Sequence, residues 1–169
     1  MPLTLINQKH EKEIPIDTCS LISLKKNYAS GHERHVARLS SLNDDDEVCA
    51  SILSIYELSA GANHAPNLQL ENDTRQVIHS IRNEFEILPV PMEEEATEIF
   101  GALKELYKDW ESPILNKRKL GNKALNRQSI DLLIATTAIR NKAILVTSDI
   151  MGAVINEFCS DFSSENWMK

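Results

Sequence analysis

SIDLLIATTAIRNKAILVTSD, residues 129–149, is the stretch that decides the fold. Its spacing predicts an apolar helix near residues 130–141, a short turn and a buried strand over residues 143–147. Two acids interrupt this apolar pattern: Asp131 falls in the first turn of the predicted helix, and Asp149 follows the predicted strand. Their placement in so apolar a stretch needs a chemical reason.

Short buried strands alternate with helices through the rest of the chain. Strands are predicted over residues 14–17, 48–50 and 86–90, and helices over residues 18–28, 32–42, 52–62, 68–85, 92–110 and 151–158. This alternation predicts an α/β fold with a central, mostly parallel sheet flanked by helices. In such sheets, ligand sites lie outside the carboxyl ends of the strands.

Composition limits the class of protein. The 169 residues fit a single domain, which we assign to residues 13–169 after an N-terminal extension over residues 1–12. The net charge of -7 argues against general electrostatic binding of nucleic acid, although a local basic patch can still bind it. The three widely spaced cysteines indicate free buried thiols rather than a disulfide framework or a zinc site. We find no signal peptide or membrane-spanning run, and therefore expect a cytoplasmic protein with no membrane association.

Four acids stand out, and each has a local explanation. Asp17 follows the first predicted strand and can cap the next helix. Glu57 can be a solvent-facing helix residue. Asp131 can complement the helix dipole, and Asp149 can belong to a turn or cap. No one of these acids is specific by itself.

As a set, the four acids predict a metal site. Asp17 and Asp149 follow strands, Asp131 opens a helix that leads into a strand, and Glu57 lies on the helix after another strand. If the strands are neighbours, the four carboxylates meet at one edge of the sheet, where like charges repel unless a cation is present. Carboxylate oxygens suit Mg²⁺ or Mn²⁺. Such an ion can activate water and stabilise charge on a phosphoryl group, which is the chemistry of phosphodiester hydrolysis.

The order and spacing of four motifs resemble those of a PIN domain, and most closely those of VapC-type toxins of bacterial toxin–antitoxin pairs. The motifs are DTCS at 17–20, ELSAG at 57–61, DLLIA at 131–135, and LVTSD at 145–149 with a terminal ENW at 165–167. Three features depart from the family pattern: Cys19 stands where Asn is common, Ile150 and the residues after it replace an acid and an aromatic, and the N-terminal extension is unusual.

The resemblance implies a PIN-like fold and a Mg²⁺- or Mn²⁺-dependent endoribonuclease that acts on an RNA substrate. It also implies a cognate antitoxin and a homodimer. The acidic metal-binding and catalytic quartet would be Asp17, Glu57, Asp131 and Asp149. Thr18 and Ser148 would be polar neighbours that hydrogen-bond the ligand carboxylates.

Several assignments stay open at the level of sequence. A basic segment can contact RNA phosphates or be an ordinary solvated loop; its residues are Lys117, Arg118, Lys119, Lys123 and Arg127. Ser129 is the expected N-cap of its helix, and His35 is an expected surface residue. The alternative to a nuclease is a non-catalytic acidic α/β module that binds a metal or a partner in regulation.

Overall fold

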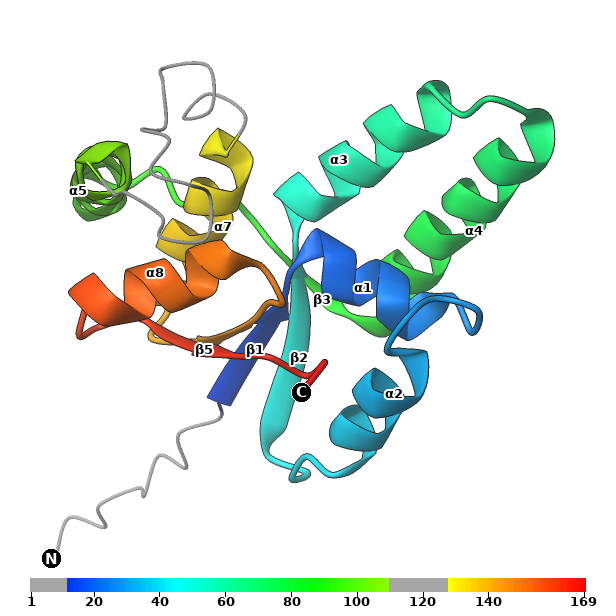
Figure 1. Cartoon of the computed structure of the whole chain (residues 1–169), viewed down its shortest axis with the longest axis horizontal. Helices are drawn as coiled ribbons and strands as arrows, with labels where there is room; N and C mark the ends of the chain where they lie inside the picture. Colours follow the sequence, from blue (N-terminus) through cyan, green and yellow to red (C-terminus); the bar gives the residue numbers. More distant parts are fainter. Residues whose placement is uncertain (1–11, 110–127) are drawn as a thin grey trace, which may run out of the picture.

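The chain alternates strand and helix as the sequence predicts. The computed structural model describes residues 12–109 and 128–169 (Figure 1). Its elements are β1 (Lys12–Ile16), α1 (Thr18–Lys25), α2 (His32–Ser40), β2 (Asp46–Ser51), α3 (Ile52–Asn63), α4 (Leu68–Glu84), β3 (Glu86–Leu88), α5 (Glu94–Asp109), α7 (Ser129–Arg140), β4 (Ile144–Val146), α8 (Ile150–Phe158) and β5 (Ser163–Glu165).

The described strands form one sheet in the order β3-β2-β1-β4-β5. Each neighbouring pair is parallel, which confirms the α/β prediction. The chain moves outward from β1 in one direction through β2 and β3, then returns to β4 and β5 on the other side. The order therefore reverses between β1 and β4, and in open parallel sheets this reversal is where ligand sites form.

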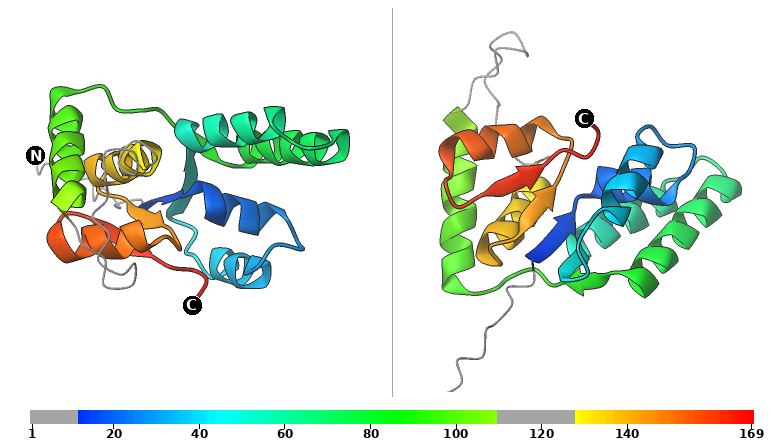
Figure 2. Two further views of the ribbon diagram at one scale, coloured as in Figure 1. Left: turned by 45° about the horizontal axis from the view of Figure 1, so that its top comes forward. Right: turned by 90° about the horizontal axis from the view of Figure 1, so that it is seen from below.

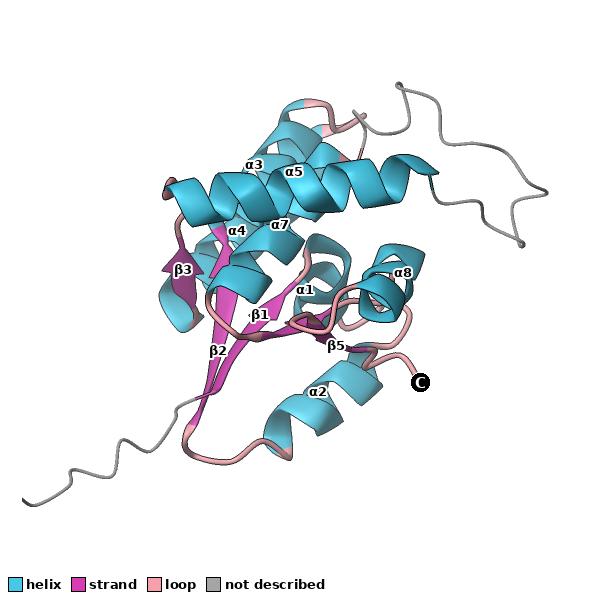
Figure 3. Cartoon of the chain, turned by 90° about the vertical axis from the view of Figure 1, so that its left-hand side faces the viewer, coloured by secondary structure: helices cyan, strands magenta, loops and turns pink. Residues whose placement is uncertain are grey.

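Two groups of helices pack on the sheet (Figure 2). In both views α5, α7 and α8 lie on one side of β1, and α1 to α4 lie on the other. Leu132, Leu145 and Ile155 belong to the core of the first group, while Ile16, Leu21 and Ile81 belong to that of the second. Figure 3 shows α5 running across α7, which is the helix predicted near residues 130–141.

Strand β5 was not predicted, because its residues have a low preference for strands. Its sequence, Ser-Ser-Glu, has neither β-branched nor aromatic residues to indicate a strand. It forms because Leu145 and Val146 of β4 provide a buried neighbour, and Val146 pairs in register with Glu165. Trp167, which is 4% exposed, then secures the end of the chain in the core of the second group.

Three smaller predictions were wrong. Ser129 is the first residue of α7 and not its N-cap. The N-cap is Gln128, whose side chain makes no capping hydrogen bond. His35 is fully buried, because its ring lies 6.0 Å from that of Trp167 and its Nδ1 bonds the carbonyl of Gly31 at 2.9 Å. Of the three thiols, Cys49 is buried as expected but Cys19 is exposed. None of the described helices is long and apolar enough to cross a membrane.

Candidate active site

Asp17 and Asp149 lie at the reversal of strand order. Ile16, the last residue of β1, pairs in register with Val146, the last residue of β4. The amide of Asp17 donates to the carbonyl of Val146 at 2.9 Å, which holds the two strand ends together. Because Asp17 follows β1 directly and Asp149 is the third residue after β4, both acids emerge from the same edge of the sheet.

Three of the four acids also occupy helix N-termini. The Asp17 carboxylate accepts from the amide of Ser20 at 2.7 Å and caps α1. The Asp149 carboxylate accepts from the amide of Met151 at 3.2 Å and caps α8, and Asp131 lies in the first turn of α7. Their local explanation is therefore correct, and it is compatible with a second role. The positive ends of three helices offset part of the repulsion among the carboxylates.

Glu57 reaches the site from α3, which belongs to the same group of helices as α1. Ser51 ends β2 and caps α3 by accepting from the amide of Leu53 at 3.1 Å, which fixes where α3 begins. Glu57 then lies in the second turn of α3. Its Oε2 accepts a hydrogen bond of 2.6 Å from Thr18 Oγ1. Thr18 thus connects α1 to a site carboxylate, as one of the two predicted polar neighbours.

The second predicted neighbour, Ser148, does not hydrogen-bond the carboxylates in this structure. Ser148 is exposed and makes no side-chain hydrogen bond within the described part of the chain. The adjacent Thr147, 4% exposed, makes the contacts instead. Its hydroxyl bonds Asp17 and so lowers the pKa of that carboxyl, and it accepts from the amide of Asp149 at 3.0 Å. Bonded to both acids, Thr147 fixes one relative to the other.

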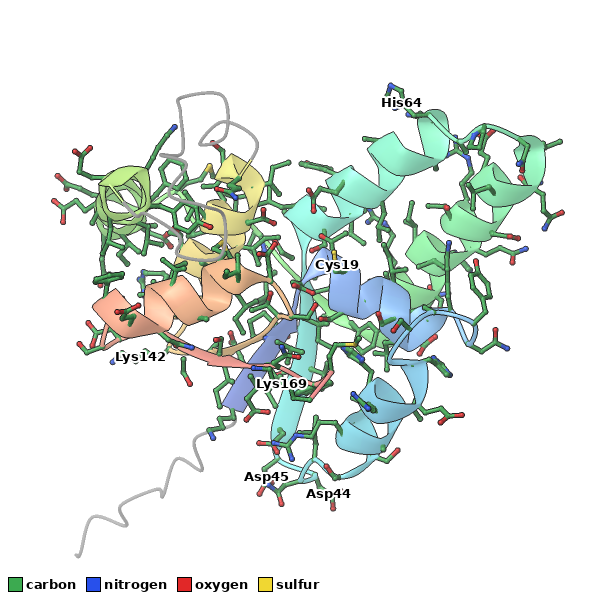
Figure 4. The ribbon with its side chains drawn as sticks, in the orientation of Figure 1. Cys19, Asp44, Asp45, His64, Lys142 and Lys169 are labelled. Carbon is green, nitrogen blue, oxygen red and sulfur yellow. The ribbon has the colours of Figure 1, made fainter. Side chains whose placement is uncertain are left out.

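The four acids line one pocket of about 430 Å³. Its lining also holds Thr18, Cys19 and a single cation among the described residues, Lys26. Ile22, Leu58 and Leu70 give it an apolar wall. Figure 4 shows Cys19 at the N-terminal end of α1, below the first turns of α3. Acids that are distant in sequence therefore share one cavity, although their roles stay a prediction.

Burial and mutual repulsion perturb the acids. Desolvation, followed by the charges of Glu57, Asp149 and Asp17, raises the pKa of Asp131 to about 7. Desolvation also raises the pKa of Asp17, against the hydrogen bonds of Thr147 and Ser20 that lower it. In a cleft, a carboxyl perturbed by burial and by specific neighbours is typical of a functional site.

The charges of the acids also raise the pKa of two neighbouring side chains. Partial desolvation at the rim of the pocket, then the charges of all four acids, raises the pKa of the Cys19 thiol. Burial, then Asp149 and Asp131, raises the pKa of Tyr107 on α5 to about 12. Tyr107 falls within the predicted helix over residues 92–110, and its position in the sequence gives no signal that it lies near the acids.

The chemistry of the lining fits a hard divalent cation. All four candidate ligands are carboxylates, and a cation would relieve the repulsion that raises the pKa of Asp131. Within residues 12–109 and 128–169, no three acidic, histidine or cysteine groups are close enough to hold an ion without rearrangement. Mg²⁺ commonly retains several waters and binds through one or two carboxylates, so an open arrangement suits it.

The basic segment cannot be placed relative to this pocket. Lys117, Arg118, Lys119, Lys123 and Arg127 all lie outside the described residues. The predicted extension over residues 1–12 does too, except for Lys12, which begins β1.

Comparison with known families identifies the arrangement. The family model described as the PIN domain matches residues 14–152, most of the chain and all four acids of the pocket. This chain belongs to the PIN domain family. Comparison with curated proteins finds no match.

Solved structures share the fold of this chain over nearly their whole length. VapBC2 from Rickettsia felis, bound to a DNA fragment from its promoter, matches with a TM-score of 0.64 and 19% identity over 92% of this chain and 98% of that one. VapBC-1 from nontypeable Haemophilus influenzae has a TM-score of 0.65 and 23% identity over 93% and 99%. VapBC-5 from Mycobacterium tuberculosis, a member of the VapBC family of toxin–antitoxin systems, matches with a TM-score of 0.60 and 17% identity. The match covers 91% of this chain and 98% of that one.

Proposed function

We propose that this PIN domain is an endoribonuclease that depends on Mg²⁺ or Mn²⁺ and hydrolyses RNA phosphodiester bonds. The observation that carries the proposal is the pocket at the strand reversal, where Asp17, Glu57, Asp131 and Asp149 come together from four separate elements. The PIN family match supports the same reading.

Asp17, Asp131 and Asp149 would hold the metal ion, and Glu57 would complete or support its shell. When bound, the metal lowers the pKa of water and neutralises charge on the phosphoryl oxygens. The protein fixes the acids in place: Thr147 bonds Asp17 and Asp149, and Thr18 bonds Glu57. Such hydrogen bonds orient the ligand oxygens before substrate arrives.

The partners we propose are a cognate antitoxin that blocks the acidic pocket and a second copy of the chain in a homodimer. The likeness to VapBC structures supports a toxin of a type II toxin–antitoxin pair, and we propose the cytoplasm as its place of action. An adjacent reading frame that encodes a small DNA-binding protein would support this pairing, and a genome without one would favour a PIN nuclease that works alone.

Cleavage of RNA by the purified chain tests the activity. With Mn²⁺ or Mg²⁺ and a broad panel of single-stranded and looped RNAs, we expect discrete products that disappear in EDTA. Asp17→Asn should reduce the rate by about 10²–10³-fold, because it removes one of the charges that hold the ion.

Asp44→Asn is the matched control. Asp44 is an exposed acid at the far end of β2 from Cys19 (Figure 4), so its variant should cleave at the wild-type rate. Full cleavage by Asp17→Asn contradicts the assignment. The absence of both cleavage and Mn²⁺ binding would favour the non-catalytic module.

The rate should depend on pH through Asp131. Because the pKa of this carboxyl is raised to about 7, protons compete with the metal below that pH. At subsaturating Mn²⁺ we expect the cleavage rate to rise from pH 6 to pH 8, and a higher Mn²⁺ concentration should move the midpoint of the rise to lower pH. A rate–pH profile that is flat over this range, at several Mn²⁺ concentrations, would refute the role of Asp131.

A further inference from the structure

A trough leads away from the acidic pocket between α1 and α4. Leu70 and Thr74 of α4 line the pocket, and Asp73 and Val77 line a second hollow beside it. The two hollows share one residue, Lys26, which is the C-cap of α1. We call these two adjoining hollows, which extend from Asp17 past Lys26 to Tyr28, the α1–α4 trough.

Lys26 is placed to offset the charge of the acids. It is the one cation among the described residues that line the acidic pocket, and no described carboxylate forms an ion pair with it. The neighbouring Lys25 differs, because it pairs with Glu84 and its ammonium lies 4.8 Å from the centre of the Phe85 ring. The charge of Lys26 is thus available to an anion in the trough.

Tyr28 presents an aromatic ring at the outer end of the same trough. Its side chain is 72% exposed, and its ring centre lies 5.9 Å from the Lys26 ammonium. A large aromatic ring so exposed has no packing role in this fold. The acid on the facing wall, Asp73, already accepts a hydrogen bond of 2.7 Å from Gln69.

A single-stranded nucleic acid matches this order of groups. Four carboxylates repel phosphates, so a substrate strand needs a cation beside the pocket to hold its backbone. Proteins that bind single strands combine cations along the backbone with aromatic rings on which bases stack. Recognition by stacking is also typical of unpaired RNA.

We propose that the α1–α4 trough holds the RNA strand next to the cleaved bond, with Lys26 contacting a phosphate and Tyr28 stacking on a base. This inference rests on the proposed nuclease function and adds the path of the substrate to it. Lys26 and Tyr28 are positioning residues, since they bind parts of the RNA that do not react.

Binding of RNA without metal tests the trough separately from catalysis. Fluorescence anisotropy in EDTA would measure the affinity of the full chain for a labelled, unstructured RNA. Tyr28→Ala should weaken binding by about 5- to 100-fold, whereas Tyr28→Phe, which keeps the ring, should stay near wild type. Lys26→Gln should weaken binding and reduce the salt-dependence slope by about 1.

Two controls match the chemistry of the variants away from the trough. Lys104→Gln removes a lysine on α5 whose ammonium lies 5.6 Å from the Phe100 ring centre, and Phe158→Ala removes an aromatic side chain that is 53% exposed. Both should bind RNA as the wild type does. Circular dichroism would establish that all variants are folded.

The outcomes separate the two proposals. If the trough variants lose RNA affinity but the wild type cleaves nothing with Mn²⁺, the trough stands and the nuclease function fails. If the wild type cleaves RNA while Lys26→Gln and Tyr28→Ala keep wild-type affinity and kcat/KM, the trough is overturned and the nuclease function stands. A trough that contacts only a protein partner would give this second result.

Discussion

Asp131→Asn is expected to make the metal-free protein more stable while it removes activity. The folded protein binds a proton at Asp131 more tightly than the unfolded chain does, because the pKa of the carboxyl rises from 3.8 to about 7. As pH rises through this window, the ionised carboxylate therefore costs stability, and the full cost is present at pH 8. The amide carries no charge and avoids the cost.

The gain in stability and the loss of activity of Asp131→Asn can both be given an expected size. One pKa unit corresponds to about 1.4 kcal/mol, and with solvent screening we expect a gain of about 1–3 kcal/mol. The melting temperature in EDTA at pH 8 should rise by about 3–8 °C, and RNA cleavage should fall by about 10²–10³-fold or more. Asp44→Asn should change neither. A lower melting temperature together with wild-type cleavage would contradict the assignment of Asp131 as a metal ligand in the pocket.

Trp167→Ala is expected to cost about 3–5 kcal/mol of unfolding free energy. Trp167 is 4% exposed and packs with Ile16, Leu21 and Val146 in the core of the second group of helices. Its Nε1 donates to Glu165 at 3.0 Å, and Glu165 also pairs with Arg38 of α2 at 3.0 Å. The side chain thereby secures β5 against β4 and the C-terminus against α2.

Urea unfolding followed by circular dichroism measures this cost. Trp167→Phe should lose less, since it keeps most of the packing, and Phe158→Ala, from an exposed position, should lose under about 1 kcal/mol. Because β5 pairs with the end of β4, where Thr147 positions two acids, activity should fall as well. Trp167→Ala with the stability of the wild type would show that the C-terminal segment is not part of the core.

Local sequence signals predicted the part of the candidate site that consists of acids beside apolar runs. Asp17 and Asp149 each follow an apolar run, and Asp131 opens an apolar helix, so the sequence pattern indicated both their place in the fold and their unusual surroundings. A helix-capping bond explains Asp17 and Asp149 individually, and the dipole of α7 explains Asp131. Only the order of strands shows that they share a pocket, and a single motif carries no information about that order.

Thr147 and Tyr107 were missed for a different reason. Strand β4 is enclosed by other elements, so Leu145, Val146 and Thr147 are all buried and no alternation distinguishes Thr147 from Ser148. Tyr107 lies close enough to Asp149 and Asp131 for their charges to raise its pKa because α5 packs across α7, and the sequence of α5 does not specify that packing. His35 is buried because Trp167, far away in sequence, closes over it. All three contacts depend on tertiary packing.

The central claim is that acids from distant segments of this PIN domain hold a divalent metal ion together. Anomalous diffraction from crystals soaked in Mn²⁺ at pH 8 tests it most directly, with Asp131→Asn crystals as the control. We expect a manganese peak in the pocket, within about 2.0–2.4 Å of carboxylate oxygens of at least two of Asp17, Asp131 and Asp149, and a weaker peak or none in the variant. No peak in wild-type crystals, or one only outside the pocket, would contradict it.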